Sequence, residues 1–384
     1  MKIPYGKQKI EVEDIEKVVE VLKSDFLTQG PIVNRFEEAF AKEVGAKYAV
    51  SFCNATAALH TSFKILNRDL RKKVIVTPIT FAASSNCVLY EGGNLEFVDI
   101  DPDSFNLDIQ KIEELLIKFP DKYQGIIPVD FAGLPVGSEK LSGLAQKYGL
   151  WILEDACHAI GGGYYDSKHN FVSVGSCAYS DLTTFSFHPV KHIATGEGGM
   201  VTTNNSDIYR KLIKLRSHGM ERDTSKLTEP SHGGWYHEMQ ELGFNYRMSD
   251  INAALGLSQL GRLTKNINSR ILIAEKYRDF FDTVGVSTQK FDREKFKNAY
   301  HLFVIQTEKR KELYDFLRER EIFSQVHYLP VYRHPYYREN GFADLNLSCA
   351  ENYYRQALSL PMFHSMSSEE LDFVLTALRE FYLS

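Results

Sequence analysis

Lys191 is the residue of this sequence best placed for nucleophilic chemistry. It lies in a loop that carries three glycines between 196 and 199, and this loop joins two predicted strands at 182–187 and 199–203. A lysine on a rigid scaffold becomes a nucleophile when burial and neighbouring groups lower the pKa of its amine. The alternative interpretation is an ordinary solvated loop lysine. A second reactive residue nearby would favour the nucleophile.

That second residue follows the short apolar run 150–153, which predicts a buried strand. Glu154 and Asp155 come at its carboxyl end, where open α/β sheets place their ligands. A carboxylate there, with an amine on a loop of a later strand, is the pair that pyridoxal 5′-phosphate (PLP) requires. The lysine forms a Schiff base with the cofactor, and the aspartate keeps the ring nitrogen protonated. Lys191 and Asp155 are therefore the predicted catalytic pair.

Strands and helices alternate in the part of the chain that must position this pair. The predicted strands lie at 48–52, 74–77, 95–98, 125–129 and 150–153, and the predicted helices begin near 54, 82, 109 and 139. Two more helices precede them, at 12–22 and 36–44, with a break at 28–31. This order and the Ile- and Val-rich strands predict an α/β fold with a mainly parallel central sheet covered by helices.

The turn after the first of these strands is a candidate phosphate site. Free backbone N–H groups and the positive end of the helix dipole at Asn54, Ala55 and Thr56 can hold an anion. Thr56 is the predicted phosphate ligand, although an ordinary helix start that binds nothing has the same composition.

The sequence changes in character beyond about residue 265. Here we expect a smaller α+β domain with strands at 302–306 and 323–328, a helix at 311–318, and a last helix capped by Ser367 and Glu370. The predicted domains are residues 1–265 and 266–384. Between helix 208–215 and the N-cap Ser249, the polar and Gly-rich span 221–234 predicts a mobile loop, a candidate lid.

Composition narrows the classes of function. The 384 residues carry a formal net charge of −5, so no broad basic field favours nucleic acid. No run of 18 apolar residues and no signal-peptide pattern occur, so we expect a cytoplasmic protein without a membrane span. The five cysteines are scattered, and Pro189 between His188 and His192 argues against a helical metal site, so no metal is expected.

Six motifs then make the chain similar to a known family, the DegT/DnrJ/EryC1/StrS sugar aminotransferases, which are fold-type I PLP-dependent transferases. The resemblance runs from Tyr5 to the last helix. The motifs are Leu-Thr-Gln-Gly-Pro at 27–31, Asn-Ala-Thr-Ala-Ala-Leu at 54–59, Thr-Phe-Ala-Ala-Ser-Ser-Asn at 80–86, Glu-Asp-Ala-Cys-His-Ala at 154–159, Phe-Ser-Phe-His-Pro-Val-Lys at 185–191, and Gly-Phe-Asn-Tyr-Arg-Met-Ser-Asp at 243–250.

The resemblance implies a set of cofactor contacts around the predicted pair. His158 is expected near the phenolic oxygen of PLP, and Phe81 is expected to stack on the ring unless it is ordinary core. Ala55 stands where the family usually has glycine. The implied cofactor-binding set is Ala55, Thr56, Phe81, Asp155, His158, Ser186, Lys191 and Asn245, with the catalytic roles on Lys191, Asp155 and His158.

It also implies partners: a nucleotide-linked keto sugar, glutamate as amino donor, and a homodimer in which Asn245 reaches the site of the neighbouring subunit. Arg247 is a candidate cation for the diphosphate. The expected substrate-binding residues are Tyr5, Asp25, Phe26, Leu27, Thr28, Gln325, Val326, His327 and Tyr328.

Within the family, the His-Pro-Val-Lys form at 188–191 and Gln-Val-His-Tyr at 325–328 are most similar to the branch of pseudaminic acid synthesis. This implies amination at C4 of a UDP-4-keto-6-deoxy-N-acetylhexosamine of the L-altro series. The alternatives are a bacillosamine-type, legionaminic-type or dTDP-linked keto sugar, and a PLP sugar dehydratase. Retention of Lys191 favours transamination over dehydration, since the dehydratase branch has histidine there. A regulatory role is disfavoured by the acidic balance and the lack of a helix-turn-helix signature.

Overall fold

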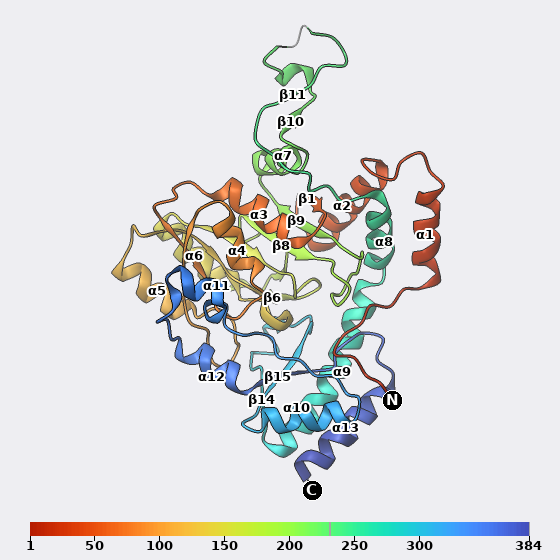
Figure 1. The fold of residues 1–384 in the computed structure, drawn as a ribbon, viewed down its shortest axis with the longest axis vertical. Coiled ribbons are helices and arrows are strands. Elements are labelled where there is room, and N and C mark those ends of the chain that lie inside the picture. Colours follow the sequence, from red (N-terminus) through yellow and green to blue (C-terminus); the bar gives the residue numbers. More distant parts are fainter. Residues whose placement is uncertain (230–231, 384) are drawn as a thin grey trace.

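The large part of the molecule is built on a seven-stranded sheet (Figure 1). The computed structural model describes residues 1–229 and 232–383. Spatial order across the sheet is β1 (Tyr48–Phe52), β9 (Gly199–Thr203), β8 (Leu182–Ser186), β5 (Trp151–Asp155), β4 (Tyr123–Ile127), β2 (Lys73–Val76) and β3 (Asn94–Phe97). Only β9 runs against its two neighbours, and the other neighbouring pairs are parallel. The predicted α/β fold with a mainly parallel sheet is confirmed.

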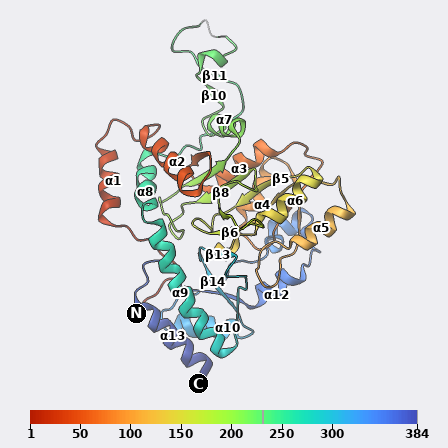
Figure 2. The ribbon, with the colours of Figure 1, turned by 180° about the vertical axis from the view of Figure 1, so that it is seen from behind.

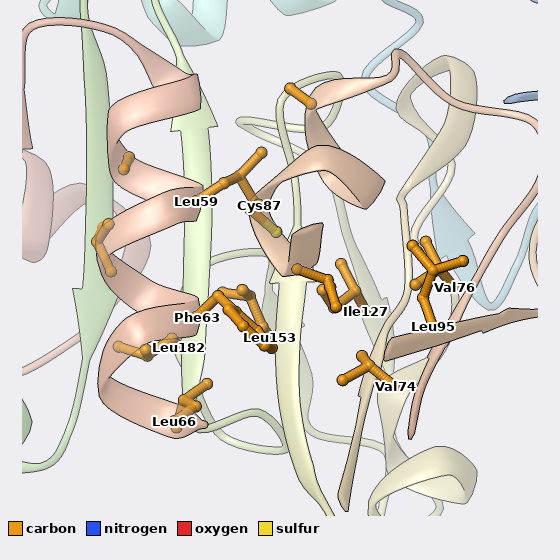
Figure 3. Close-up of a cluster of buried hydrophobic side chains, with 14 of the residues drawn as sticks. Leu59, Phe63, Leu66, Val74, Val76, Cys87, Leu95, Ile127, Leu153 and Leu182 are labelled. Carbon is orange, nitrogen blue, oxygen red and sulfur yellow. The ribbon is translucent and has the colours of Figure 1, made fainter. Parts of the chain in front are cut away.

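Helices cover both faces of this sheet because successive strand side chains point to opposite sides. Val74 and Val76 of β2 join one apolar cluster, with helices α3 (Ala55–Leu66) and α4 (Ala83–Tyr90). Figure 3 shows this cluster, in which Phe63 of α3 lies against the sheet. Ile75 joins the opposite cluster, with α5 (Ile109–Lys118) and α6 (Ser138–Tyr148). Each strand therefore anchors helices on two sides.

Three further helices pack beside the sheet: α1 (Val12–Leu22), α2 (Pro31–Val44) and α8 (Asp250–Leu260). The second begins five residues before the predicted start at 36, because Pro31 suits the first position of a helix. The buried carboxylate of Asp250 accepts hydrogen bonds from the amides of Gly30 (2.8 Å) and Ile32 (2.9 Å). As predicted, the Ser249 side chain caps α8.

A smaller unit follows the 22-residue helix α9 (Leu263–Val284). Its antiparallel sheet has the order β12 (Ser287–Thr288), β14 (Phe303–Gln306), β15 (Ala357–Leu360), with α10 (Arg310–Glu319) and α13 (Ser368–Leu383) beside it. The capping box of Ser367 and Glu370 is present. The domain boundary at 265 stays a prediction. Of the helices in the described residues, none has the length and hydropathy needed to cross a membrane.

The predicted strand at 323–328 is wrong. Those residues form a single bridge, from Gln325 to Ser359 of β15, and the preceding Ile322 bridges Ile3. The reason is that β15 takes the place beside β14, so the segment 323–328 meets the sheet only at the far edge of β15, at one residue. Ile3 lies in the apolar core of this unit, and α12 (Ser348–Gln356) leads the chain into β15.

An arm between α7 (Ser206–Leu215) and α8 extends away from the rest of the chain (Figures 1 and 2). It contains the antiparallel pair β10 (Met220–Glu221) and β11 (Glu238–Met239). The lid predicted at 221–234 includes residues 230–231, which lie outside the described residues. The rest of that span points away from the sheet rather than over it. Trp235 at 80% and Leu242 at 72% exposure place large apolar side chains on the surface of the otherwise polar arm.

Candidate active site

The reactive residues gather where the parallel strands reach their carboxyl ends. β5 ends at Asp155 and β8 at Ser186, while the antiparallel β9 starts at Gly199. The loop that carries Lys191 therefore leaves and re-enters the sheet at this edge. The amide of Phe187 donates to the Gly198 carbonyl (2.9 Å), which closes the base of the loop. The predicted placement of the lysine between two strands is confirmed.

Asp155 is a buried carboxylate with two hydrogen bonds. It is 4% exposed. Its Oδ2 accepts from the hydroxyl of Ser84 on α4 at 2.6 Å, and its Oδ1 accepts from the amide of Cys157 at 3.1 Å. These hydrogen bonds fix the direction of the carboxylate at the edge of the sheet.

Lys191 supplies the amine at the same edge. Burial lowers the pKa of Lys191 to about 8, and the negative charge of Asp155 opposes this shift. The Nζ atom lies 3.4 Å from Nε2 of His301, a residue just before β14. A large fraction of the amine is therefore neutral at slightly alkaline pH, as nucleophilic and proton-transfer chemistry require.

His158 lies beside this pair in its neutral form. Burial lowers the pKa of His158 well below its usual value, and the charge of Lys191 lowers it further. Its Nδ1 accepts from the amide of Ala132 at 3.4 Å. The other nitrogen, Nε2, then carries the proton and faces the hydroxyl of Tyr328 at 3.3 Å.

Aromatic rings from distant parts of the chain form one wall of the site. The Tyr5 and His327 rings lie 5.5 Å apart between centroids, and Tyr328 lies 6.4 Å from Phe81. His327 is held by its Nδ1, 2.9 Å from the Ser359 hydroxyl. Phe81 is 64% exposed. An exposed aromatic at the carboxyl edge of the sheet is not ordinary core, and its face is available to a ligand.

The amino end of α3 lies beside the start of β9. The Asn54 side chain caps the helix by accepting from the Ala57 amide at 2.8 Å. Ala55 and Thr56 are partly buried in the first turn, where helix amides have no partner within the helix. Gly199 lies against this turn, since a Cβ on it would stand 2.7 Å from the Ala55 nitrogen. Ser186, partly buried, ends β8 nearby.

The other predicted residues belong to the 25–28 turn, the base of the arm and the segment 325–326. The exposed residues Asp25, Phe26, Leu27 and Thr28 form the turn before α2. Asn245 is exposed and pairs with Ser217 at the base of the arm, where Arg247 also contacts Ser217. Gln325 is exposed, and Val326 packs on the core of the smaller unit. Among the described residues, none of these side chains forms a hydrogen bond with Lys191.

Two residues of this edge were not predicted. Ser84, which holds Asp155, lies within the motif at 80–86, so its position was available from the sequence. His301 had no such signal, because it precedes an apolar strand whose packing explains the local pattern.

Comparison with known proteins decides the family. Residues 8–379 match the DegT/DnrJ/EryC1/StrS aminotransferase family. The chain belongs to this family. It is 37% identical to the UDP-4-amino-4,6-dideoxy-N-acetyl-beta-L-altrosamine transaminase of Campylobacter jejuni over 97% of this chain and 95% of the relative. The resemblance drawn from the six motifs is confirmed.

Solved structures of this aminotransferase family superpose over the whole chain. Helicobacter pylori PseC, an aminotransferase involved in the biosynthesis of pseudaminic acid, has a TM-score of 0.88 at 31% identity and covers 100% of both chains. The putative sugar aminotransferase Spr1654 of Streptococcus pneumoniae in its PLP form has a TM-score of 0.90 at 26% identity, covering 100% of this chain and 99% of that one. The chain is a PLP-dependent sugar aminotransferase.

The carboxyl edge suits this cofactor. It offers an amine, a buried carboxylate and a helix amino end, which match the aldehyde, ring nitrogen and phosphate of PLP. Beside Asp155, the Thr184 hydroxyl is buried and has no hydrogen-bond partner among the described residues. When bound, PLP supplies an aldehyde that takes up amino groups and a ring that stabilises negative charge on the neighbouring carbon.

Proposed function

We propose that this aminotransferase moves the amino group of glutamate to C4 of a UDP-linked 4-keto-6-deoxy-N-acetylhexosamine of the L-altro series, a step of pseudaminic acid synthesis. The observation that carries the proposal is that buried Asp155 and the Lys191 amine, whose pKa is about 8, lie at the same edge of the sheet, where the charge of the carboxylate acts on the amine. Its 37% identity to an altrosamine transaminase supports the choice of sugar.

The roles of the residues follow from their chemistry. Lys191 bonds the cofactor and, as a free amine, takes and returns the proton that moves during amino transfer. Asp155 holds the proton on the ring nitrogen, because an anion next to a pyridinium favours its protonated form. His158, as a neutral hydrogen-bond donor, would hold the cofactor near its phenolic oxygen, and the exposed Phe81 would offer its face to the ring.

Phosphate is held at the other end of the site. Ala55 and Thr56 offer the first amides of α3, and the Ser186 hydroxyl offers a further donor. Asn245 contributes to the phosphate of a second copy, since its exposed side chain belongs to the segment at the base of the arm.

The sugar nucleotide lies against the aromatic wall. Tyr5, His327 and Tyr328 supply apolar faces for the deoxy methyl group and polar tips for the hydroxyls and acetamide. The 25–28 turn and residues 325–326 complete the surface, and Arg247 is the cation for the diphosphate.

We propose a homodimer with shared sites. The supporting observation is the arm, whose exposed Trp235, Met239 and Leu242 are apolar groups that a monomer would leave in water. A second copy is the occupant that the position of Asn245 at the base of the arm favours.

The test is incubation of the purified enzyme with PLP, glutamate and each C5 epimer of the UDP-linked 4-keto sugar. We expect the L-series epimer to be aminated at C4, with 2-oxoglutarate formed in equal amount. Amination of only the D-series sugar would replace the pseudaminic assignment by a bacillosamine-type or legionaminic-type role. Loss of water without net amine transfer would indicate a dehydratase.

A further inference from the structure

His301 lies in direct contact with the amine that the proposed function depends on. Its Nε2 is 3.4 Å from Lys191 Nζ. No other hydrogen-bond partner of Nζ occurs within residues 1–229 and 232–383. The imidazole is 4% exposed, and its ring centroid lies 4.3 Å from that of His158. The amine is therefore held from one side by a single buried ring.

We propose that His301 is the positioning residue of Lys191, which accepts a hydrogen bond from its amine and thereby sets its direction and charge state, and that Arg270 fixes His301 in place. This inference rests on the proposed role of Lys191. The contact concerns the free amine, which is the form in which the lysine takes and gives protons.

The imidazole is suited to be an acceptor. Burial lowers the pKa of His301 well below its usual value, and the charge of Lys191 lowers it further. A neutral ring that accepts at Nε2 carries its proton on Nδ1. Other titratable or charged groups act on the pair from every side, namely Asp155 and Cys157 on the lysine, His158 and His192 on the histidine, and Arg270 on both.

Arg270 braces the backbone that carries this ring. The guanidinium is fully buried on α9. Its Nη1 donates to the carbonyls of Tyr300 (3.1 Å), His301 (3.3 Å) and Met362 (3.1 Å). Tyr300 has a φ of 47°, a conformation that a bulky residue keeps only when its surroundings enforce it. The brace explains why a buried arginine stands next to the site.

A second brace starts from the lysine loop. His192, the residue after Lys191, lies with its Nε2 2.9 Å from the carbonyl of Ala299. This contact ties the loop to the segment 299–301, one residue from Lys191 and two residues from His301. Lys191 and His301 are held at a fixed distance by bonds on both sides.

Removal of the acceptor should lower the pKa of the lysine further. A hydrogen bond to a charged group stabilises that charge, and its loss corresponds to a shift of about one pKa unit. In an apolar variant, the ammonium form would lose its only partner among the described residues.

The experiment uses the cofactor-free protein, in which the rate of acetylation of Lys191 by acetic anhydride is followed against pH by mass spectrometry of its peptide. His301→Gln and His301→Asn form a matched pair, because the Gln amide oxygen reaches the position of Nε2 and the Asn oxygen does not. We expect a wild-type midpoint near 8, a similar midpoint for Gln, and a midpoint lower by about one unit for Asn and for His301→Leu.

Two further variants separate positioning from general packing. His60→Leu removes another buried histidine, which contacts Tyr246 and Glu91 away from the amine, and should leave the midpoint unchanged. Arg270→Lys keeps the positive charge that acts on Lys191 but loses the planar guanidinium that holds three carbonyls, so it should shift the midpoint in the same direction as His301→Asn. Equal midpoints for wild type, His301→Asn and His301→Leu would overturn the inference.

A failure of this inference can be distinguished from a failure of the proposed function. If PLP added to the wild-type protein bonds Lys191 while the His301 variants leave the midpoint where it was, only the inference fails. If PLP does not bond Lys191 in the wild type, the proposed function fails whatever the midpoints are.

Discussion

At the scale of single residues, the edge of the sheet combines one buried carboxylate, Asp155, with two buried neutral imidazoles, His158 and His301. The carboxylate of Asp155 is held in place because Ser84 and the amide of Cys157 donate to it. His158 and His301 are kept neutral by burial, so they do not compete with the ring nitrogen for this carboxylate. The negative charge is thereby reserved for a cationic partner.

Asp155→Asn should retain PLP but lose activity by roughly 100-fold or more, because a neutral amide does not hold the proton on the ring nitrogen. The fold should survive, since the Ser84 hydroxyl can turn to serve an amide. Steady-state rates and the absorbance of bound PLP measure both parts. Wild-type turnover in this variant would remove Asp155 from its proposed role.

Lys191 should also make stability depend on pH. Its folded pKa of about 8 lies below the unfolded value near 10.5, so the unfolded chain binds more protons between these values. The free energy of unfolding therefore rises with pH across this window.

Compared with Lys191→Met, the cofactor-free wild type should be less stable at pH 7.5, with a gap that narrows by pH 9.5. Urea unfolding at both pH values measures the gap. A gap independent of pH would show that the amine is not perturbed in the folded protein.

At the scale of elements, the site depends on how closely β9 approaches the amino end of α3. Gly199 opens β9, and any side chain there would press on the Ala55 nitrogen. The first turn of α3 is held by the Asn54 cap. The start of α3, where we propose the phosphate binds, is thus held by the Asn54 cap and by β9, which can approach it because Gly199 has no side chain.

Gly199→Ala should weaken PLP binding by roughly tenfold or more, because displacing the α3 turn misaligns its amides. Titration with PLP measures the affinity. Gly143→Ala is the control, since a Cβ at that exposed position meets nothing within 4 Å. Equal affinities for the two variants would argue against a phosphate at this turn.

Elements were predictable where periodic pattern and packing agree. The strands predicted at 182–187 and 199–203 are buried and pair with neighbouring strands of the sheet, and their apolar pattern predicted them correctly. The strand predicted at 323–328 failed because pairing depends on which segment reaches β14, and β15 reaches it from farther along the chain. His301 escaped notice for a related reason, since its contact with Lys191 spans 110 positions of sequence.

At the scale of the whole molecule, the arm extends away from the rest of the described chain. Trp235 is 80% exposed and Leu242 is 72% exposed, so the arm presents large apolar side chains to water. The proposed dimer would cover them and bring Asn245 to the neighbouring site. Sequence composition could not predict the direction of this arm. A polar, Gly-rich span has the same composition whether it folds over its own chain or extends away from it.

Mixing Lys191→Ala with Asn245→Ala subunits tests the shared site. Each mixed dimer has one site with an intact lysine from one chain and an intact asparagine from the other, so activity should return to up to about half of the wild-type value per mixed dimer. Each variant alone is the control. No recovery after confirmed subunit exchange would mean that each chain completes its own site.

The central claim is that Lys191 is the residue that bonds PLP at this edge. Borohydride reduction of the PLP-loaded enzyme fixes the cofactor to its lysine, and peptide mass spectrometry identifies the labelled position. We expect one labelled peptide per chain, with the label on Lys191, and no label in Lys191→Ala. A label on another lysine in the wild type, or an unchanged label in the variant, would contradict it.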